Sequence, residues 1–574
     1  MELTPTKKVL FTLNEGANLA EVREALIADA EIGRLGGFIP VVNDAGCVLG
    51  TITDSDLRKQ VSVMGNEDST AGKICNREFI HAKSDLSPSG IAESVLTQLK
   101  RRRIANSFPI TYLPLIKEDK TISKIIHISD ILPAIEDLNR QVIVLGQGFV
   151  GLTLSMALVD SGMKVFALEK NTETITAIQM LKPQVFEPQL TEILTSNLGL
   201  NYSISESELP DRAPIFCRRA YIIAVGTPHK ADQTDLSQIE DAVIKISKSL
   251  EYGDLVLLRS TVPVGTTKKL VGEAIFKRCG LIPGIDFNLA YTPERTVEGN
   301  AIAETRRLPQ LIAGYTEECA QAAMKFFSGF VSTVVLMESL EACELAKLSS
   351  NAYRDVIFGF ANEIAISASR FGIDVNRMIS DANVGYARNA IPQPSPGVGG
   401  PCLTKDSYMI TGNPESSVIL SARAVNELMP ELVANQLKSL LSDQSDEILI
   451  VGLCFKGTPP TNDLRNSPAI EIHNKLKEFG FQLAGADSSA SHKSLLENGI
   501  KPLNSYETGS FNPKLIAILN NHASNLEMVR EILKFLPENV DRILYDPWNL
   551  ATEFDFPGIF SKTFRLATTS LRIE

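Results

Sequence analysis

An α/β fold is predicted for this chain of 574 residues: two Rossmann-like parallel-sheet domains joined by a long central helix and preceded by a tandem α+β module. Strand-like and helix-like segments alternate over residues 139–335 and again over 431–574, as they do in parallel sheets. Helical periodicity fills residues 336–430, and a repeated strand–turn–strand pattern fills residues 1–138. The length also exceeds what one hydrophobic core can organise.

The first 138 residues contain two copies of one pattern. In GGFIPVVNDAGCVLGTITDSDLRK, a strand ends at Val42, a turn follows, and a second strand over 48–53 leads into a capped helix. A looser copy, ANSFPITYLPLIKEDKTISKIIHISDILPAI, places Asp130 where the first copy has Asp56, 74 residues earlier. Two such copies indicate a tandem repeat. The pattern resembles a pair of cystathionine-β-synthase (CBS) motifs.

The CBS resemblance implies a regulatory or nucleotide-binding module over residues 1–138. In that family a Thr or Ser and an Asp, here Thr53 and Asp56, hold the ribose of adenine nucleotides. The second copy has His127 in place of the threonine, which weakens the case for a nucleotide there. Helix capping is the alternative for both aspartates and is favoured for Asp130. Packing between subunits is another role open to the module.

The next domain begins with a G-x-G-x-x-G motif formed by Gly146, Gly148 and Gly151. The motif follows a strand and opens a helix, so its backbone is expected to approach a pyrophosphate at the helix N-terminus. Glu169 ends the next strand, where a carboxylate takes a ribose 2′-hydroxyl and repels a 2′-phosphate. The unit predicts NAD rather than NADP, a preference that the adjacent Lys170 reduces. A tight turn without a ligand is the alternative.

Two further loops are expected beside that motif. VGTP (225–228) and STVPVGTT (260–267) each follow a strand, and loops at strand ends line the crevice of an open sheet. Thr227 is therefore a candidate cofactor contact, although both loops are also explained by turn chemistry. The sheet itself is predicted from six segments: QVIVLG, KVFALE, AYIIAVGT, DLVLLRST, FNLAYTPE and PQLIAG.

The remaining architecture follows from helical and then strand-like periodicity. The segment CELAKLSSNAYRDVIFGFANEIAISASRFG predicts about eight turns of helix that end at Gly372. After residue 440, four strand-like segments alternate with helices and predict the second α/β domain: EILIVGLCF, FQLAGAD, KLIAIL and RILYDP.

Composition excludes several classes of function. The net charge is −12 and no long basic run occurs, which argues against nucleic acid as a partner. Eight cysteines without a CxxC pair, and only six histidines, argue against a disulfide framework and a metal site. No signal peptide is apparent, and the apolar run 142–159 fits a buried βα unit better than a membrane span. A cytoplasmic protein is expected.

Seven motifs between residues 141 and about 550 resemble the nucleotide-sugar 6-dehydrogenases, which include the UDP-glucose and UDP-N-acetylhexosamine dehydrogenases. They are GQGFVG, VFEPQL, STVPVGTT, YTPERTVEGNAI, ELAKLSSNAYRD, GVGGPCLTKD and GLCFKGTPPTNDLRNSP. The resemblance implies oxidation of a sugar C6 alcohol to the uronate by two hydride transfers to NAD⁺, for surface polysaccharide precursors. It also implies a thiohemiacetal and a thioester on one cysteine.

By this resemblance Cys402 is the nucleophile, although its glycine-rich loop alone is also consistent with a small residue in a turn. Lys347 matches the lysine that stabilises the developing oxyanion, and Asn351, four residues later on the same helix face, would donate to the same region. Asp406 matches the carboxylate that positions water and accepts a proton together with Lys347. The glycines before Cys402 are expected to let substrate approach the backbone closely.

Other site residues follow from the same resemblance. Glu294 matches the glutamate that activates the hydrolytic water, with an N-cap or a salt bridge as the alternative, and Thr261 belongs to the same water network. Arg388 aligns with an arginine that contacts substrate from a neighbouring subunit, which implies at least a dimer. Lys456 and Arg465 match residues on the nucleotide-sugar side and near the cofactor, respectively.

The chain departs from the family pattern at three places. Gln189 follows Glu187 and a proline where the family usually has Glu-Pro-Gly, so this loop is expected to differ. Trp548 replaces an arginine that many relatives carry two residues after a strand-end aspartate, and Pro401 precedes the cysteine. These changes bear on the choice of sugar, which the sequence does not reveal.

Two alternatives stay open at this level. One is a nucleotide-sensing CBS/Rossmann binding protein without turnover, and the other is a two-electron hydroxyacid dehydrogenase. The cysteine loop and the second α/β domain argue against the hydroxyacid dehydrogenase. The presence of all four residues Cys402, Lys347, Glu294 and Asp406 argues against a protein without turnover.

Overall fold

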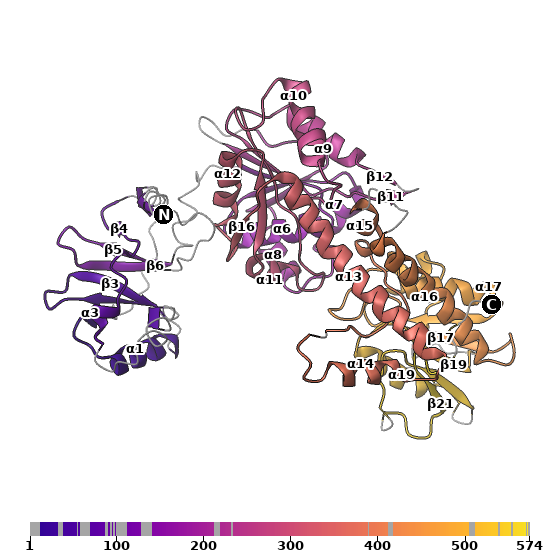
Figure 1. Cartoon of the computed structure of the whole chain (residues 1–574). Helices are drawn as coiled ribbons and strands as arrows, with labels where there is room; N and C mark the ends of the chain where they lie inside the picture. Colours follow the sequence, from indigo (N-terminus) through magenta and orange to yellow (C-terminus); the bar gives the residue numbers. More distant parts are fainter. Residues whose placement is uncertain are drawn as a thin grey trace.

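The computed structural model places two sheet-containing α/β units on either side of one long helix, α13 (Leu340–Ser369) (Figure 1). Asp130 lies outside the described residues. The structure describes residues 12–31, 38–53, 56–57, 69–86, 90–91, 94–95, 98, 112–127, 141–211, 218–230, 233–388, 390–410, 417–503, 511–537, 540–552, 555–569 and 571.

The N-terminal residues form two small sheets with the same connectivity, which confirms the predicted repeat. In each sheet the first pair of strands is parallel, the second is antiparallel, and a bulge lies at the equivalent place. The two hairpins meet where the Val48 N–H donates to the Lys120 carbonyl at 3.0 Å. The elements are β1 (Leu13–Asn14), α1 (Leu19–Glu31), β2 (Phe38–Val42), β3 (Val48–Thr53), α3 (Ala71–Ile74), β4 (Ala82–Lys83), β5 (Tyr112–Ile116) and β6 (Ile122–His127).

The larger sheet has the order β16-β15-β14-β13-β10-β7-β8-β9. All six predicted segments are strands in it, and two short edge strands, β9 and β16, join them. Its pairings are parallel except for β14 with β15, and such an antiparallel pair is common near the edge of a doubly wound sheet. The strands are β7 (Gln141–Leu145), β8 (Val165–Leu168), β9 (Tyr202–Ser205), β10 (Arg219–Ile223), β13 (Leu255–Leu258), β14 (Asn288–Tyr291), β15 (Gln310–Gly314) and β16 (Val334–Leu336).

Helices cover this sheet because their apolar faces pack into two clusters of buried side chains. The hairpin β11 (His229–Lys230) with β12 (Gln233–Thr234) follows β10. The helices are α6 (Phe149–Asp160), α7 (Thr172–Gln179), α8 (Leu190–Asn197), α9 (Ser237–Ser247), the π-helix Thr267–Glu273, α10 (Ala274–Cys279), α11 (Ala301–Arg307) and α12 (Glu317–Phe327).

The helical region is dominated by α13, whose 30 residues begin at the cap Ser339. The helix ends just before Gly372, which adopts φ +62°, so the predicted stop is confirmed. Three further helices follow: α14 (Val375–Asn383), α15 (Leu403–Ile410) and α16 (Val418–Ser439).

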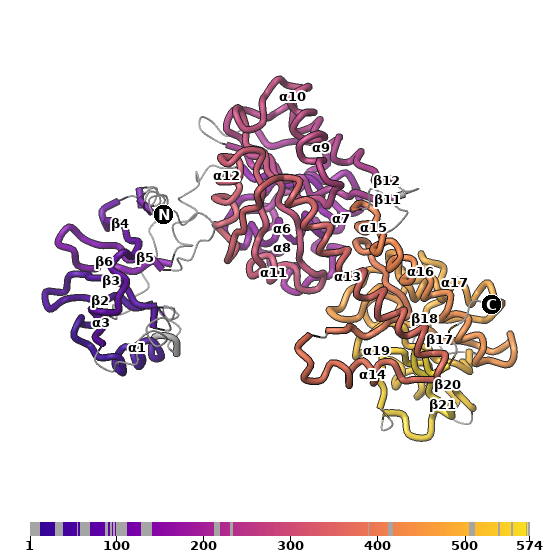
Figure 2. Tube along the Cα trace, in the orientation of Figure 1, coloured from indigo at the N-terminus to yellow at the C-terminus, as the bar shows by residue number. Residues whose placement is uncertain are grey.

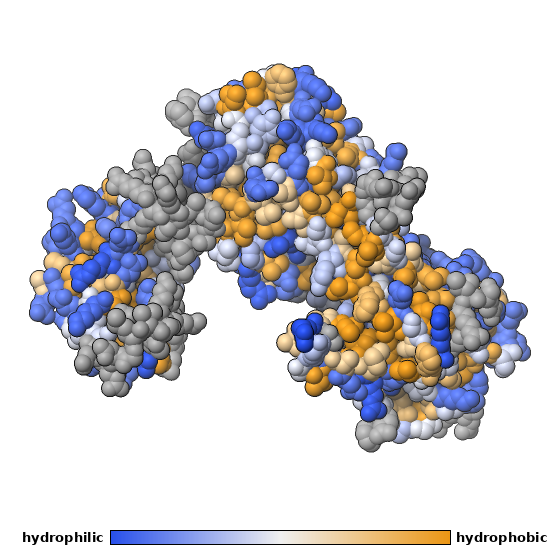
Figure 3. All heavy atoms as spheres, viewed as in Figure 1, coloured by the Kyte–Doolittle hydropathy of each residue, from blue (hydrophilic) through white to orange (hydrophobic). Residues whose placement is uncertain are grey.

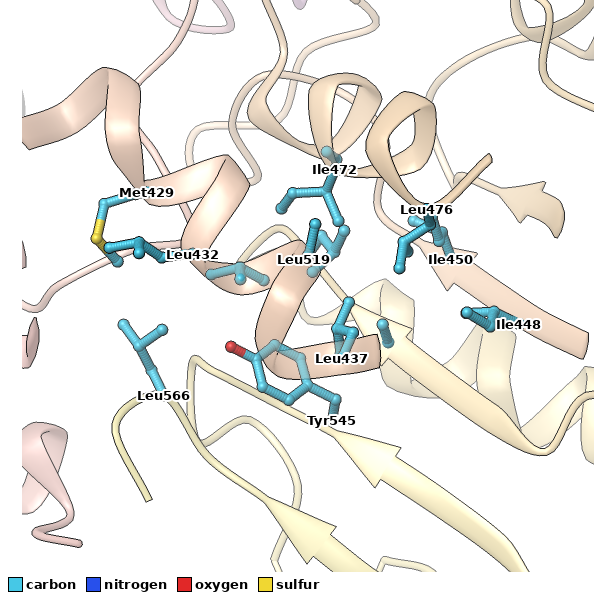
Figure 4. Close-up of a cluster of buried hydrophobic side chains, with 14 of the residues drawn as sticks. Met429, Leu432, Leu437, Ile448, Ile450, Ile472, Leu476, Leu519, Tyr545 and Leu566 are labelled. Atoms are coloured by element: carbon cyan, nitrogen blue, oxygen red, sulfur yellow. The ribbon is translucent and has the colours of Figure 1, made fainter. Parts of the chain in front are cut away.

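The C-terminal sheet is fully parallel in the order β18-β17-β19-β20-β21. Its core includes α16, since Met429, Leu432 and Leu437 belong to the same cluster of buried side chains as Ile448 and Ile450 of β17 (Figure 4). The elements are β17 (Glu447–Val451), α17 (Pro468–Glu478), β18 (Gln482–Ala486), α18 (His492–Glu497), β19 (Leu515–Ile518), α19 (Ser524–Leu533), β20 (Arg542–Tyr545) and β21 (Phe560–Phe564). Within the part of the chain that the structure describes, every helix is too short or too polar to cross a membrane.

Candidate active site

The glycine loop between β7 and α6 is shaped for a ligand that approaches its backbone. Gly146 has φ +91°, and a Cβ on Gly151 would lie only 1.9 Å from the Gly146 carbonyl oxygen, so the first and third glycines are required by packing. A Cβ on Gly148 would meet no atom within 4 Å, and this residue caps α6 without a side-chain hydrogen bond. The first turn of α6 therefore leaves its N–H groups open toward an anion.

Glu169 lies directly beside this loop, as the motif predicts. Its carboxylate accepts hydrogen bonds from the backbone N–H of Gln147 at 2.6 Å and of Asn171 at 2.9 Å. Lys170 forms an ion pair with Asp241 on α9. The cation that reduced the predicted preference for NAD thus has a carboxylate partner of its own. These groups fit an NAD ribose better than a 2′-phosphate.

The two Thr-containing loops meet, as expected. Thr227 is buried, and its hydroxyl donates to the Thr261 carbonyl at 2.7 Å. The second loop is fixed by Glu344 of α13, which accepts from the Gly265 N–H at 2.5 Å and from the Thr267 N–H at 2.8 Å. Burial raises the pKa of Glu344 despite these donors. Sequence reasoning missed this residue, although a glutamate three residues before Lys347 was a usable signal.

Cys402 immediately precedes α15, and its carbonyl accepts the N–H of Asp406 at 3.0 Å. The residue is exposed, and its thiol is free. The preceding glycines have a packing role that the sequence did not predict. A Cβ on Gly399 would lie 2.0 Å from the Asn466 carbonyl oxygen, and one on Gly400 would lie 2.7 Å from the Phe455 ring. These glycines let the loop approach the C-terminal domain closely, and close approach of a substrate stays a prediction.

Opposing charges surround the Cys402 thiol. Crowding by neighbouring protein atoms raises the pKa of this thiol, and the negative charge of Asp406 raises it further. Lys347, Lys405 and Arg465 act in the other direction. The residue is thus exposed as a whole, and several neighbouring charges act on the ionisation of its thiol.

One face of α13 holds the cysteine helix in place. Asn351 is buried, and its amide donates to the Asp406 carboxylate at 2.6 Å. One turn later, Asp355 accepts from the Ser407 hydroxyl at 2.8 Å and from the Arg423 guanidinium at 3.0 Å. Lys347, one turn before Asn351, is also buried. The structure thus brings together four predicted residues, Cys402, Lys347, Asn351 and Asp406.

Asp355 and Arg423 were not anticipated from the sequence. Arg423 also donates to the Val398 carbonyl at 2.8 Å, so it ties the cysteine loop to α13 and α16. The spacing of Asp355, four residues after Asn351, placed it on the same face and could have identified it. Its partner Arg423, 68 residues away, gave no local signal.

Glu294 is buried in an ion pair with Arg259. Its carboxylate also accepts the N–H groups of Arg295 and Thr296, both at 2.7 Å. Burial alone would raise the pKa of Glu294, but Arg259 and the Thr296 hydrogen bonds outweigh it and hold the pKa below its usual value. These contacts match the salt-bridge alternative given for this residue.

The C-terminal domain contributes two cations near the thiol. Lys456 donates to the Glu298 carbonyl at 2.7 Å, and burial lowers its pKa. Arg465 makes a two-pronged hydrogen bond to Asp463 with distances from Nε of 2.9 and 3.0 Å. The charge of Arg465 also acts to lower the pKa of the Cys402 thiol. Its predicted place near the cofactor stays a prediction.

The departures from the family pattern have structural counterparts. Gln189 adopts φ +66°, so the left-handed turn is kept without the usual glycine. Asp546 follows β20 and forms a 2.6 Å ion pair with Arg565, which follows β21. The backbone N–H of Trp548 donates to the same Asp546 carboxylate. Arg388 is exposed and lies over the Tyr386 ring at 5.2 Å.

In the N-terminal module, Thr53 and Asp56 bond to each other. The Thr53 hydroxyl donates to the Asp56 carboxylate at 2.7 Å, and the backbone N–H of Asp56 donates to the Thr53 hydroxyl at 3.3 Å. This reciprocal pair is a capping arrangement. It agrees with the alternative given for Asp56, and it also places both oxygens together.

Comparisons with known proteins agree with this geometry. The sequence matches the UDP-glucose/GDP-mannose dehydrogenase family in its NAD binding domain over residues 140–331, its central domain over 341–427 and its UDP binding domain over 449–553. A CBS domain matches residues 2–63.

Among curated relatives, the UDP-N-acetyl-D-mannosamine dehydrogenase of Pyrococcus horikoshii is 33% identical over 350 residues, which cover 59% of this chain and 82% of the relative. The NDP-N-acetyl-D-galactosaminuronic acid dehydrogenase of Ralstonia solanacearum is 34% identical over 59% of this chain and 80% of its own length.

The fold is also that of solved dehydrogenase structures. The UDP-D-ManNAc dehydrogenase structure from Pyrococcus horikoshii aligns with TM-score 0.65 and 28% identity, over 75% of this chain and 100% of its own. A UDP-N-acetyl-mannosamine dehydrogenase from Staphylococcus aureus aligns with TM-score 0.61 and 25% identity, over 74% and 98%. The chain therefore belongs to the UDP-glucose/GDP-mannose dehydrogenase family of NAD-dependent nucleotide-sugar dehydrogenases.

Proposed function

We propose that the protein oxidises the C6 hydroxymethyl group of a UDP-hexose to a carboxylate in two NAD-dependent steps, for surface polysaccharide precursors. The observation that carries this proposal is the exposed Cys402 thiol set among Asp406, Lys347 and Lys405. Relatives whose names specify N-acetylmannosamine or N-acetylgalactosaminuronic acid favour an N-acetylated hexose over glucose.

Each residue has a step that suits its chemistry. Bound NAD⁺ would supply the hydride acceptor. The Lys347 ammonium stabilises the alkoxide at C6, and the Cys402 thiolate then adds to the aldehyde carbon to give a thiohemiacetal. After the second oxidation, water attacks the thioester and returns the free thiol. Asp406, oriented by Asn351, takes the proton from that water.

Glu294 has a narrower role in this scheme. Its carboxylate stays ionised beside Arg259 and is therefore a weak base, although it suits the orientation of the hydrolytic water together with Thr261. Proton removal falls to Asp406, which lies close to the thiol.

The stoichiometry of NADH tests the proposal. The intact chain should form two NADH per nucleotide sugar and release the uronate, with UDP-N-acetylhexosamines preferred in a panel of UDP- and GDP-sugars. Cys402→Ala should form no uronate, whereas Cys279→Ala, at another exposed thiol, should behave like the parent. One NADH per sugar would instead support a two-electron dehydrogenase. No NADH with any nucleotide sugar would support the binding protein.

We also propose that two chains pair along α13. Leu345, Tyr353 and Phe360 recur on this helix at intervals of eight and seven residues, and their exposed fractions are 44%, 66% and 51%. Figure 3 shows apolar atoms gathered along the course of this helix. A partner would also bring the exposed Arg388 to a second site. Sedimentation should give a dimer or larger oligomer, and Tyr353→Glu should dissociate it; a monomeric parent would refute the pairing.

The N-terminal module is proposed to bind an adenine nucleotide through Thr53 and Asp56, whose oxygens lie 2.7 Å apart at the start of a helix. Calorimetry on the full chain with ATP, ADP, AMP and NAD should show a site that Thr53→Ala weakens and that Cys402→Ala leaves unchanged. If NAD is the one nucleotide that gives heat, and Thr53→Ala does not change that heat, the nucleotide binds at the glycine loop and the proposed N-terminal site is refuted.

A further inference from the structure

We propose that Lys405 is a positioning residue for the second oxidation: its ammonium group joins the cysteine-bearing helix α15 to the cofactor-binding loops and keeps a positive charge beside the Cys402 thiol. The proposal rests on the function proposed above. It assigns a role to a residue for which the sequence suggested none.

Lys405 bridges two parts of the site. Its Nζ donates to the Thr227 hydroxyl at 3.1 Å and lies 3.4 Å from an Asp406 carboxylate oxygen. Thr227 in turn donates to the Thr261 carbonyl at 2.7 Å. The side chain of Lys405 is only 19% exposed, so its ammonium has exchanged much of its water for these two partners. One cation therefore contacts both the loop that carries Thr227 and the carboxylate of Asp406 near the thiol.

A second contact shows that α15 lies against the NAD-binding domain over one face. Tyr408, one turn after Lys405, stacks on His229 with ring centroids 5.4 Å apart and planes inclined by 15°. Residues three apart share a helix face, and their partners Thr227 and His229 are two residues apart. Figure 2 shows α15 next to the β11–β12 hairpin. The alignment of α15 on this segment thus depends on two side chains, of which Lys405 is the one nearer the thiol in sequence.

The charges that face Cys402 explain why this cation matters. Asp406 is the anion among them, and the cations are Lys347, Lys405, Lys456 and Arg465. Lys405 is the cation that also pairs with Asp406, so its loss would remove one positive charge and leave the Asp406 charge less compensated. Both effects disfavour the thiolate.

The second oxidation depends on this charge more than the first. Removal of the first hydride from the C6 alcohol needs no sulfur. The next step forms a bond between the Cys402 sulfur and the aldehyde carbon, and the carbonyl oxygen receives the electron pair. Only this later step draws on the fraction of Cys402 that is ionised.

Alkylation of Cys402 tests the charge role without turnover. Iodoacetamide labelling of the intact protein, followed by peptide mapping, gives the rate at Cys402 across pH. We expect Lys405→Met to slow labelling on the order of threefold to tenfold at neutral pH and to move the profile toward higher pH. Lys405→Arg should retain the parent profile. Lys493→Met, an exposed lysine paired with Glu497, is the matched control and should change nothing.

A double-mutant cycle tests the bridge to Thr227. The nucleotide-hexose 6-aldehyde, supplied directly, isolates the second oxidation. Lys405→Met should slow this step more than the first, and its effect should be smaller in a Thr227→Val background, because the two changes remove one shared contact. Fully additive effects would overturn the bridging role.

Two further outcomes decide the rest. An alkylation profile of folded Lys405→Met identical to that of the parent would overturn the charge role. If that variant does not fold, the Lys405→Gln profile gives the same test. Failure of the parent to oxidise any nucleotide sugar would remove the proposed function, while the alkylation result would still report on Lys405.

Discussion

The side-chain amide of Asn351 donates a 2.6 Å hydrogen bond to the carboxylate of Asp406, across 55 residues of sequence and between two helices. Asp406 is almost fully buried, and its other carboxylate oxygen accepts no hydrogen bond among the described residues. The orientation of the carboxylate beside Cys402 therefore depends on this one amide and on the nearby Lys405.

Asn351→Leu, which keeps the volume but removes the donor, should destabilise the protein by about 1–3 kcal/mol. It should also lower kcat more than it raises KM, because Asp406 loses its orientation while substrate contacts stay. Urea unfolding and steady-state kinetics measure the two effects. Ser350→Ala, on the exposed side of the same helix, is the control. A purely structural loss, with kcat unchanged, would contradict the role given to Asn351.

Gly400→Ala should lower the free energy of unfolding by more than the positive φ of this residue alone accounts for. Gly400 has φ +91°, and its added Cβ would meet the Phe455 ring at 2.7 Å. Gly199 has φ +78° with open space around it, so Gly199→Ala measures the backbone strain by itself, about 1–2 kcal/mol. We expect Gly400→Ala to cost about 1–3 kcal/mol more from the clash. Equal losses in thermal unfolding would mean that the cysteine loop moves freely away from Phe455.

The choice between NAD and NADP should depend on Glu169 and, less directly, on Asp241. Glu169→Ser removes the charge that repels a 2′-phosphate and should raise kcat/KM for NADP on the order of tenfold. Because Lys170 pairs with Asp241, adding Asp241→Asn should release that lysine and raise NADP use further. Asp241→Asn alone should change little while Glu169 is present. If it matched the double variant, Glu169 would not contact the ribose.

The pair of Glu294 with Arg259 should make stability depend on pH. The folded-state pKa of Glu294 is lowered, so its contribution is complete above the usual carboxyl pKa of about 4.3 and is lost as pH falls through the lower folded value. Glu294→Gln leaves Arg259 buried without its anion and should cost about 3–5 kcal/mol near neutral pH.

The difference between parent and Glu294→Gln in free energy of unfolding should then shrink as the solution is acidified. Guanidinium unfolding across this pH range provides the measurement. A constant difference would show that the carboxylate is already protonated at neutral pH.

Local patterns predicted the parts of the structure that local forces determine. Gly146, Gly148 and Gly151 serve a strand–turn–helix unit whose geometry is set within a few residues, so their spacing was sufficient. The end of α13 shortly before Gly372, which has a positive φ, was predictable for the same reason. The edge strand β9 was missed because its sequence YSIS has one buried side chain and no apolar run, and β16 was missed because it has only three residues.

The sequence identified candidate site residues better than it identified the contacts that these residues make. Asp406 was identified, but its partner Asn351 was expected only to serve the same region, because the pairing depends on how two helices pack. Glu294 pairs with Arg259, 35 residues away, so the salt bridge given as the alternative for this residue had a partner that the sequence did not identify. The glycines before Cys402 pack against Asn466 and Phe455, neighbours that only the tertiary fold supplies and that the sequence did not predict.

The buried face of α13 also sets the distance between two parts of the site. Glu344 holds the loop at Gly265 and Asp355 holds the cysteine helix, and the two are eleven residues apart on one helix. At about 1.5 Å per residue the helix acts as a spacer of about 16 Å between the cofactor loop and the cysteine helix. A single inserted residue would rotate every later side chain by about 100° and misalign Asn351 and Asp355 together. Insertions and deletions in α13 should therefore abolish activity, whereas the surface loops of either sheet should tolerate them.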